Sequence, residues 1–442
     1  MRIAIWHNLP TGGGLRVLDD QLRGLASLGH ELHVWAPPTA ARCDAVDAVA
    51  TYHEITLDLP APREGTFRQL AWAWRGRRED LDAFADHASR CAREISGIRP
   101  DVVLAHPCQF FRVPAIAQYI DIPSVLYLQE PNRRLYEASF DYPWKAASAT
   151  RSLRPSSVRT FVDDAIRVEQ ARIQVRAETA WIDAFDDVLV NSAFSRESVL
   201  RAYGRLSRVS PLGIDTDRFP FQERPARSRG NVCTVGALVL EKNPVFLVRA
   251  VAAAGPAVQR FTWVANFVNR WHRDLAERAA TEAGVSLDVR VSLSAEDLLS
   301  SYSEADVFVY APRLEPFGLA PLEANATGLP VVAVAEGGVR ETMVEGVNGT
   351  VVEHDAAAFG AAVAALIGDI DHARALGVSA RQHVVERWPI KTSIETLEAN
   401  LRFVLERRRE PAAAEQSRDF RLLPGEDLPD SQGMAVGDID EG

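Results

Sequence analysis

The chain has 442 residues, of which 47% are hydrophobic and 25% are charged, and its formal net charge is −11. This is the composition of an ordinary globular protein, and it excludes a disordered, a collagenous or a nucleic-acid-coating protein. At about 100–200 residues per domain, the length indicates two or three domains. Among the 49 basic residues only Lys145, Lys242 and Lys391 are lysine, so each lysine stands out against a background of arginine.

Apolar runs alternate with stretches of helical spacing along most of the chain. A first series predicts buried strands at residues 2–7, 31–36, 101–105, 124–128 and 187–191. A second series predicts strands at residues 231–235, 260–265, 288–292, 307–310, 330–335 and 349–353. Such alternation indicates parallel sheets with helices on both faces, and two series indicate two doubly wound α/β domains.

Composition suggests where these domains begin and end. We expect one domain over residues 1–210 and a second over residues 230–385. The polar segment 211–229 between them is rich in proline and arginine and suits a linker. Residues 411–442 are strongly acidic and have few large apolar side chains, so they predict a disordered tail.

The cysteines and the apolar runs bear on the cellular compartment. Cys43, Cys91, Cys108 and Cys233 fit neither a zinc site nor a disulfide scaffold, which predicts buried free thiols. The amino-terminal segment lacks the apolar core and cleavage site of a signal peptide. The longest apolar stretch, residues 356–368, is shorter than the roughly 18 residues that span a bilayer. We therefore expect a cytoplasmic protein.

Ligands of doubly wound sheets bind beyond the carboxyl ends of the strands, and the loop after the first strand contains Gly12, Gly13 and Gly14. Consecutive glycines allow backbone N–H groups at a helix N-terminus to approach an anion or a sugar closely. Val17 replaces the third glycine of the dinucleotide-binding fingerprint, and no acid ends the next strand, so a nicotinamide cofactor is disfavoured. The alternative is a tight strand-to-helix turn.

A second unusual loop, residues 236–244, contains Lys242 just before Pro244. Proline is typical of a first helical turn, and a lysine beside a helix N-terminus suits a phosphate group. The alternative is a solvated surface lysine. The scarcity of lysine favours the phosphate site, because an ammonium and a guanidinium are not equivalent ligands.

A third loop, residues 313–324, follows the strand predicted at 307–310. Glu315 precedes a predicted helix and Glu323 lies eight residues later, with Gly318 between them. The backbone N–H groups are suited to holding a diphosphate, and the carboxylates to accepting hydrogen bonds from sugar hydroxyls. The alternative, two surface carboxylates near a helix N-terminus, leaves the following Gly337-Gly338 turn unexplained.

These motifs together resemble those of glycosyltransferase family 4, the retaining nucleotide-sugar transferases of the GT-B fold. The resemblance extends to about residue 405 and includes the segments 29–34, 191–195, 211–215 and 337–341. The segment 386–410 resembles the family's final helix, which crosses back to the amino-terminal domain. The resemblance implies that the first domain faces the acceptor and that the second binds the nucleotide sugar.

The resemblance also implies roles on the donor side. Glu315 would contact hydroxyls of the transferred sugar, Glu323 the ribose, and Lys242 the leaving phosphate. The other donor-binding positions would be Gly13 and Gly14 of the glycine loop and the backbone amides of Phe317, Gly318 and Leu319. No metal and no separate cofactor is expected, since the nucleotide sugar is itself the substrate.

On the acceptor side, His106 matches a position where the family often has a histidine beside the hexose. The alternative is a turn histidine whose hydrogen bonds are satisfied. Glu130 and Arg133 lie in a segment that reads His-x-Pro-x-Arg in some members, with Gln129 here in place of the histidine. They are therefore candidates for acceptor contacts.

The implied activity is transfer of a hexose from a UDP- or GDP-linked sugar to a glycan, a lipid-linked or a small-molecule acceptor. Two stretches rich in arginine, residues 63–78 and 145–176, suit peripheral contact with an anionic membrane on its inner face, and the first also contains Trp72 and Trp74. The alternative for both is an ordinary solvated helical face.

One position departs from the family pattern. Members usually carry arginine where this chain has Ala237. A lost charge-assisted hydrogen bond is worth about 1.5–3 kcal/mol. Donor binding is then weaker, or another cation such as Arg313 substitutes, or the protein is a catalytically silent GT-B partner subunit. A nucleotide-sugar epimerase on the same fold is a further alternative.

Overall fold

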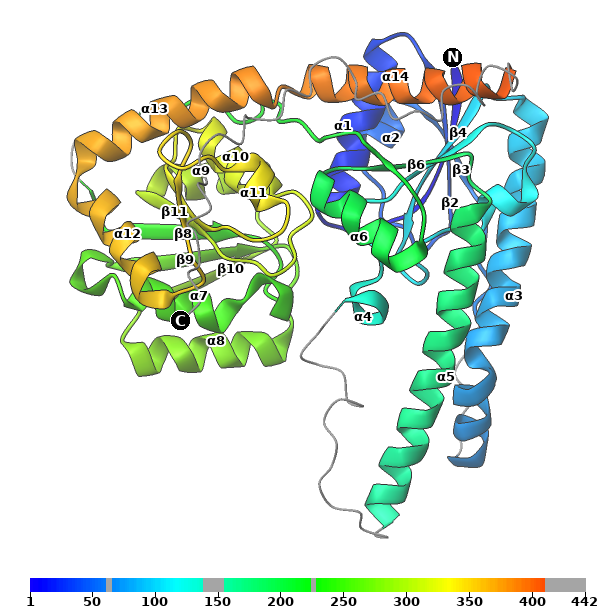
Figure 1. The fold of residues 1–442 in the computed structure, drawn as a ribbon, viewed down its shortest axis with the longest axis horizontal. Coiled ribbons are helices and arrows are strands. Elements are labelled where there is room, and N and C mark those ends of the chain that lie inside the picture. Colours follow the sequence, from blue (N-terminus) through cyan, green and yellow to red (C-terminus); the bar gives the residue numbers. More distant parts are fainter. Residues whose placement is uncertain (61–65, 138–154, 224–227, 410–442) are drawn as a thin grey trace, which may run out of the picture.

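The computed structural model describes residues 1–60, 66–137, 155–223 and 228–409 of the chain. Two α/β units lie side by side, and α13 (Ile370–Arg387) and α14 (Ile390–Arg409) run across both along one edge (Figure 1). Each unit has a parallel sheet with helices packed on it. The fold class expected from the alternation of strands and helices is therefore confirmed.

The first sheet has seven strands within the described residues, in the order β3-β2-β1-β4-β5-β6-β7. They are β1 (Arg2–Asn8), β2 (Glu31–Ala36), β3 (Thr51–Glu54), β4 (Val102–Cys108), β5 (Ser124–Tyr127), β6 (Asp187–Val190) and β7 (Arg208–Val209). The helices are α1 (Gly13–Ser27), α2 (Asp44–Val49), α3 (Thr66–Ile98), α4 (Arg133–Tyr136), α5 (Pro155–Asp183) and α6 (Ala193–Tyr203). The long helices α3 and α5 pack together and extend beyond the sheet (Figure 1).

The second sheet, in the part of the chain that is described, has the order β10-β9-β8-β11-β12-β13. Its strands are β8 (Asn231–Val235), β9 (Arg260–Ala265), β10 (Leu287–Val291), β11 (Val307–Tyr310), β12 (Val331–Val334) and β13 (Thr350–Val352). Its helices are α7 (Pro244–Ala252), α8 (Arg270–Ala283), α9 (Ala295–Glu304), α10 (Leu319–Ala326), α11 (Val339–Thr342) and α12 (Ala356–Gly368).

The strand predictions missed two edge strands and shortened one central strand. β3 and β7 contain no apolar run, because each lies at an edge of its sheet with its residues only partly buried. β4 continues to Cys108, three residues beyond its predicted end. The extension places His106 inside the strand and not in the loop after it, so that part of the prediction is wrong.

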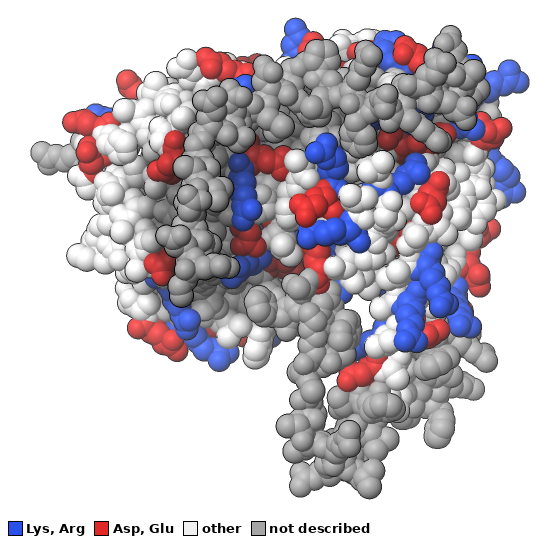
Figure 2. Space-filling model, in the orientation of Figure 1, with Lys and Arg blue, Asp and Glu red and all other residues white. Residues whose placement is uncertain are grey.

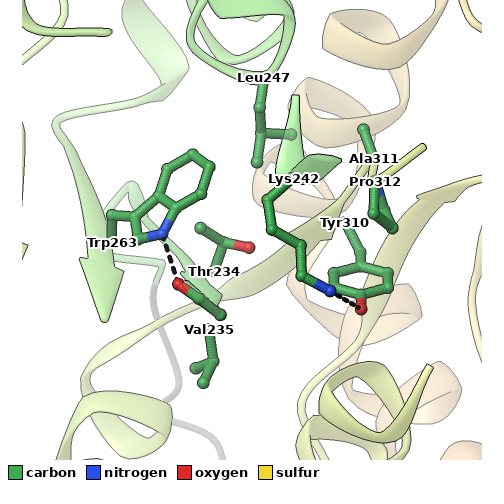
Figure 3. A pocket seen from close by; sticks show the side chains of 9 residues that line it. Thr234, Val235, Lys242, Leu247, Trp263, Tyr310, Ala311 and Pro312 are labelled. Carbon is green, nitrogen blue, oxygen red and sulfur yellow. Dashed lines mark hydrogen bonds between the residues drawn. The ribbon is translucent and has the colours of Figure 1, made fainter. Parts of the chain in front are cut away.

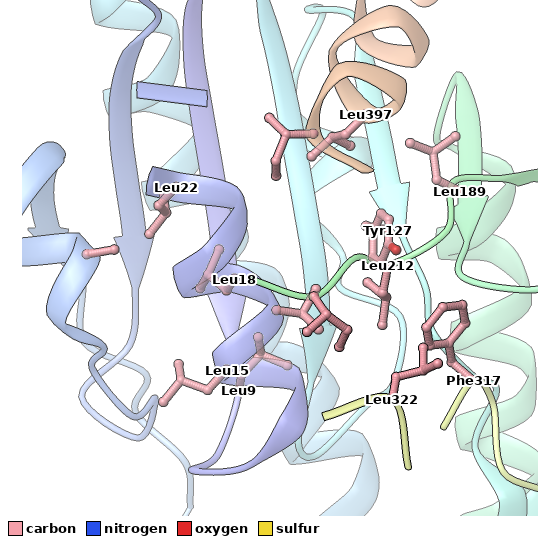
Figure 4. Packing of buried hydrophobic residues seen from close by; sticks show 14 of the residues in the cluster. Leu9, Leu15, Leu18, Leu22, Tyr127, Leu189, Leu212, Phe317, Leu322 and Leu397 are labelled. Atoms are coloured by element: carbon pink, nitrogen blue, oxygen red, sulfur yellow. The ribbon is translucent and has the colours of Figure 1, made fainter. Parts of the chain in front are cut away.

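One hydrophobic cluster joins the two units. It includes Leu18 of α1, Leu322 of α10 and Leu397 of α14, together with Leu212 of the connecting segment (Figure 4). α14 packs closely on α1, since a Cβ on Gly24 would overlap the side chain of Ile394. Helix α14 therefore lies against the first unit, and the two units share a core across their boundary.

The chain also crosses between the units twice, along neighbouring paths. The backbone N–H of Ile214 donates to the Trp388 carbonyl at 2.8 Å, and that of Ile390 donates to the Ile214 carbonyl at 3.2 Å. Because both crossings are hydrogen-bonded to each other, a hinge motion between the units must move them together.

The remaining sequence expectations concern cysteines, membrane and termini. All four cysteines are free, with Cys43 partly exposed and the other three buried. No single helix in the described ranges is long and apolar enough to cross a membrane, although α12 and α13, bent by 101°, pass the length and composition criterion as a pair. Residues 63–65, Lys145 and the acidic segment 411–442 lie outside the described residues.

Charged side chains of both signs are interspersed over the face on which the two units meet (Figure 2). Basic side chains also gather near α5 on this face (Figure 2). Arg172 and Arg176 of α5 are exposed. Arg78 of α3 is exposed as well, and it lies 3.5 Å from Glu169 of α5. Arg78, Arg172 and Arg176 are thus accessible to solvent, and Arg78 is partly neutralised by Glu169.

Candidate active site

The loop after β8 brings Lys242 to the carboxyl end of β11. Lys242 ends a short 3-10 turn, Leu240–Lys242, and α7 then begins with Pro244. The ammonium lies 2.5 Å from Glu315 Oε2. It also lies 3.4 Å from the hydroxyl of Tyr310 (Figure 3). The side chains of Lys242 and Glu315 are only 24% and 12% exposed. Lys242 is therefore not a solvated surface lysine.

A small pocket lies beside this ion pair. Lys242 and Tyr310 line it on one side and Trp263 of β9 on the other, with Gly236 at the turn after β8 (Figure 3). The indole N–H of Trp263 donates to the Gly236 carbonyl at 2.9 Å, which holds the turn against the neighbouring strand. The pocket therefore lies at the carboxyl ends of the strands, where ligands of such sheets bind.

The loop after β11 contributes a helix N-terminus to the same site. Gly318 is the residue before α10 and has a φ of +98°, a left-handed conformation that favours glycine. Among the described residues no side chain caps this helix, so the first-turn N–H groups lack a side-chain acceptor. Only the backbone of Phe317 is available to a ligand, because its ring is buried 5.2 Å from that of Trp388.

The Gly337-Gly338 turn holds this loop in place. The backbone N–H of Gly338 donates to the Glu315 carbonyl at 2.7 Å. A Cβ on Gly338 would overlap the Pro316 carbonyl oxygen, and a Cβ on Gly337 would lie 2.5 Å from that of Glu315. The two glycines are therefore required so that two loops of the second unit can pack backbone against backbone.

Glu323 lies behind the helix N-terminus and is almost fully buried. Its Oε1 forms an ion pair with Arg16 of α1, and its Oε2 accepts a hydrogen bond from Tyr302 at 3.2 Å. Arg16 was not among the predicted site residues. Its position three residues after Gly13, on the first turn of the helix that follows the glycine loop, was the available signal.

The glycine loop lines a larger hollow of about 530 Å³ in the first unit. Gly13 and Gly14 form one wall, and Arg112, Gln129 and Glu130 form another. Nothing lies within 4 Å of a Cβ built on Gly13, so this wall borders open space. The structure thus places the glycine loop and Glu130 around one hollow.

Glu130 is held by two arginines. Its carboxylate lies 2.6 Å from Arg133 and 2.9 Å from Arg112. Burial alone would raise the pKa of Glu130, but Arg133, Arg112 and Lys242 together hold it below its ordinary value. Arg133 also donates to the backbone carbonyl of Arg313 at 3.0 Å, across the boundary between the units. Arg112, which was not predicted, joins the expected acceptor-side pair at the cleft.

Further hydrogen bonds hold the two units together around the site. Ser192 Oγ donates to the Pro316 carbonyl at 2.5 Å. The carboxylate of Glu341 accepts from the backbone N–H groups of Ala193 and Phe194, both at 2.8 Å, at the N-terminus of α6. The cleft is consequently closed at the level of the Glu315 loop.

Arg313, the other cation considered for the position of Ala237, pairs with a different carboxylate in this structure. Its guanidinium lies 3.2 Å from Glu336, and its backbone N–H donates to the Glu241 carbonyl at 2.7 Å. Its cation is therefore directed to another carboxylate of the same unit, at the rim of the site.

His106 is fully buried in β4, and neither ring nitrogen has a hydrogen-bond partner among the described residues. The alternative of a satisfied turn histidine is therefore wrong. Its ring lies 5.8 Å from that of Tyr127. Burial, with a smaller contribution from His7, lowers the pKa of His106 to about 3, and burial lowers that of His7 to about 4.

Because His7 and His106 are buried in the neutral form, we expect the protein to lose stability in mild acid. Below pH 6.5 these two histidines bind protons in the unfolded chain, whereas in the native state they stay neutral down to about pH 4. The free energy of unfolding therefore falls as the pH falls. Urea unfolding should show that His106→Leu reduces the loss between pH 6.5 and 5 by roughly 1–2 kcal/mol. The control is His372→Leu on α13, because that side chain is exposed and not part of the buried histidine pair. Equal pH dependence in wild type and His106→Leu would contradict the prediction.

Two family models match the chain and together run from residue 11 to residue 383. The model described as Glycosyltransferase Family 4 matches residues 11–218, and the one described as Glycosyl transferases group 1 matches residues 215–383. The chain belongs to glycosyltransferase family 4. The family expected from the motifs is confirmed.

Relatives with curated descriptions match about half of the chain. A GDP-mannose-dependent alpha-(1-6)-phosphatidylinositol monomannoside mannosyltransferase of Mycolicibacterium smegmatis is 32% identical, over 47% of this chain and 59% of that protein. D-inositol 3-phosphate glycosyltransferase 1 of Catenulispora acidiphila is 33% identical, over 48% of this chain and 56% of that protein. The chain thus matches little more than half the length of these family members.

Solved structures extend the likeness to nearly the whole fold. Sucrose-phosphate synthase from Thermosynechococcus elongatus superposes with a TM-score of 0.64 at 18% identity, covering 94% of this chain and 100% of the other. Anabaena Alr3699/HepE, solved in complex with UDP and glucose, superposes with a TM-score of 0.63 at 18% identity, covering 91% and 99%. At such identities the likeness concerns the fold, which is the two-domain GT-B fold of the family.

Proposed function

We propose that this family 4 protein is a retaining glycosyltransferase that transfers a hexose from a UDP- or GDP-linked sugar. The observation that carries the proposal is the Lys242–Glu315 ion pair, at 2.5 Å, beside the uncapped N-terminus of α10. A sugar diphosphate requires a cation and N–H donors for its phosphates and a carboxylate for its sugar hydroxyls, and these groups lie together here.

Donor binding would exchange the partners within this ion pair. The ammonium of Lys242 would turn to the leaving phosphate, and the carboxylate of Glu315 would accept hydrogen bonds from sugar hydroxyls. Neither charge is then left unpaired in a site that is largely shielded from water. Because the diphosphate gains negative charge as it leaves, a fixed cation and fixed N–H donors stabilise the transition state more than the ground state.

The acceptor would enter from the hollow in the first unit. Glu130 borders that hollow and is kept ionised by Arg112 and Arg133, so it is suited to orient an acceptor hydroxyl. The acceptor is a glycan, a lipid-linked sugar or a small molecule. The exposed arginines on α5 favour approach to an anionic membrane, as a lipid-linked acceptor requires.

A thermal-shift screen with UDP, GDP, ADP and their sugars tests the donor assignment. A ligand at about 100 times its Kd stabilises the native state by about 2.7 kcal/mol, which raises the melting temperature by roughly 5–10 °C for domains of this size. Ligands that raise it are then incubated with and without candidate acceptors, and nucleotide release is measured. Absence of both binding and nucleotide release would refute the proposal.

The same screen separates two other functions. Ala237, at the position of the usual arginine, favours a catalytically silent partner subunit, which would bind a nucleotide and release nothing. A nucleotide-sugar epimerase would convert the donor into a second nucleotide sugar with no acceptor present. Acceptor-dependent release of nucleotide distinguishes the transferase from both.

A further inference from the structure

The charged side chain of Arg16 is largely buried between the two units. It projects from the first turn of α1, and its guanidinium reaches Glu323 of α10. The guanidinium also lies 5.1 Å from the ring centre of Phe219 in the connecting segment. The side chains of Arg16 and Glu323 are 25% and 3% exposed. This ion pair therefore joins the helix after the glycine loop to the helix after Glu315.

Both oxygens of Glu323 are engaged. Arg16 binds Oε1, and the hydroxyl of Tyr302 donates to Oε2 at 3.2 Å. Burial lowers the pKa of Arg16, and Arg218 lowers it further, while Tyr302 and Asp20 act in the opposite direction without restoring it to its ordinary value. With one donor on each oxygen, the orientation of the Glu323 carboxylate is restrained, and a rotation about its last bond would break at least one of these two contacts.

We propose that Arg16 is a positioning residue that keeps Glu323 ionised and oriented for the ribose of the nucleotide. The proposal rests on the proposed function and on the ribose contact that the family resemblance implies for Glu323. A buried carboxylate without a cation binds a proton more readily and becomes a weaker acceptor. Arg16 comes from the opposite unit, so the quality of the ribose site depends on closure of the cleft.

The test compares one nucleotide with its 2′,3′-dideoxy form, which lacks the hydroxyls that Glu323 would bind. The nucleotide is whichever of UDP, GDP or ADP gives the largest thermal shift. Wild type should prefer the ribonucleotide by on the order of 10-fold to 100-fold in Kd, the effect of a hydrogen bond to a charged group. Arg16→Gln should lose most of that preference, and calorimetric titration measures both constants.

The matched control is Arg23→Gln on the same helix. Arg23 lies 2.9 Å from Asp19, one turn away on α1, and its side chain is 49% exposed. This variant should keep the full preference for ribonucleotide. A purely structural role of Arg16 would lower the melting temperature without changing the preference, and that result would overturn the proposal.

Two further variants keep the test decisive. Glu323→Gln should abolish the preference, and adding Arg16→Gln to it should change the preference no further, whereas additive losses would overturn the proposal. If Arg16→Gln does not fold, Arg16→Lys replaces it, since a lysine keeps the charge without the planar pair of donors and should retain only part of the preference. An unchanged preference in Arg16→Lys, with Arg16→Gln unfolded, would also contradict the positioning role.

The failure of the proposed function has a different signature. If wild type binds none of the nucleotides, the ribose assignment fails and the proposed function fails with it. Small-angle X-ray scattering then tests whether the Arg16–Glu323 ion pair holds the two units together. Arg16→Gln should have a larger radius of gyration than both wild type and Arg23→Gln. Equal radii would overturn the remaining part of the proposal.

Discussion

Replacing Lys242 with alanine should lower the rate of sugar transfer roughly 10²-fold to 10³-fold, the loss expected when a fixed electrostatic partner of the transition state is removed. The ammonium is the group that the proposal places on the leaving phosphate. Its loss would also leave Glu315, only 12% exposed, without the cation that lies 2.5 Å away. An unpaired carboxylate in that position repels the diphosphate, so the Kd of the donor should rise as well.

Lys391→Ala is the control for this experiment. Lys391 is 83% exposed on α14 and lies 3.9 Å from Glu395, so its removal should leave transfer unchanged. Lys242→Arg is a sharper variant, because it keeps the charge but presents a wider, planar group to a turn in which the lysine packs against Gly236. It should recover only part of the activity. A loss in Lys242→Ala no greater than that in Lys391→Ala would contradict the phosphate role.

Gly338→Ala should lower the stability by about 1–3 kcal/mol and the transfer rate by a larger factor. The new methyl group would overlap the carbonyl oxygen of Pro316, and that oxygen belongs to the backbone, so no rotamer change relieves the overlap. The φ of Gly338 is −69°, which alanine adopts easily, so the effect is one of space and not of backbone strain. The loop that carries Glu315 must move to make room.

The melting temperature and the steady-state rate together test this displacement. For domains of this size 1 kcal/mol corresponds to roughly 2–4 °C, so a fall of several degrees is expected. Gly368→Ala is the matched control, because nothing lies within 4 Å of a Cβ at that end of α12. Full activity in a folded Gly338→Ala protein would show that the position of the loop does not matter to the reaction.

The sequence alone identified some residues of the candidate site but not the contacts between them. Lys242 was identified by composition, since lysine is rare in this chain, and Glu315 by its place between a strand and a helix. Their direct contact was not predictable, because 73 residues separate them along the chain. The contact arises because β8 and β11 are neighbours in the sheet, an order that periodicity does not reveal.

His106 shows the opposite case, in which the local pattern misled. The sequence Leu104-Ala105-His106-Pro107 suggested a loop, because a histidine and a proline follow apolar residues. The strand continues through both residues, and the histidine is buried without a hydrogen-bond partner in the described residues. A polar residue in a central strand is not distinguishable by pattern from one in the loop that follows.

By itself the amino-acid sequence determined the family, the two doubly wound domains and the loops that carry the charged residues. It did so because strand and helix periods are local, and because the family motifs are short and contiguous. Only the tertiary structure decided which charges meet: Lys242 with Glu315, and Arg16 with Glu323 across the cleft. Such pairs depend on strand order and on how the two units close on each other, and the local sequence pattern reveals neither.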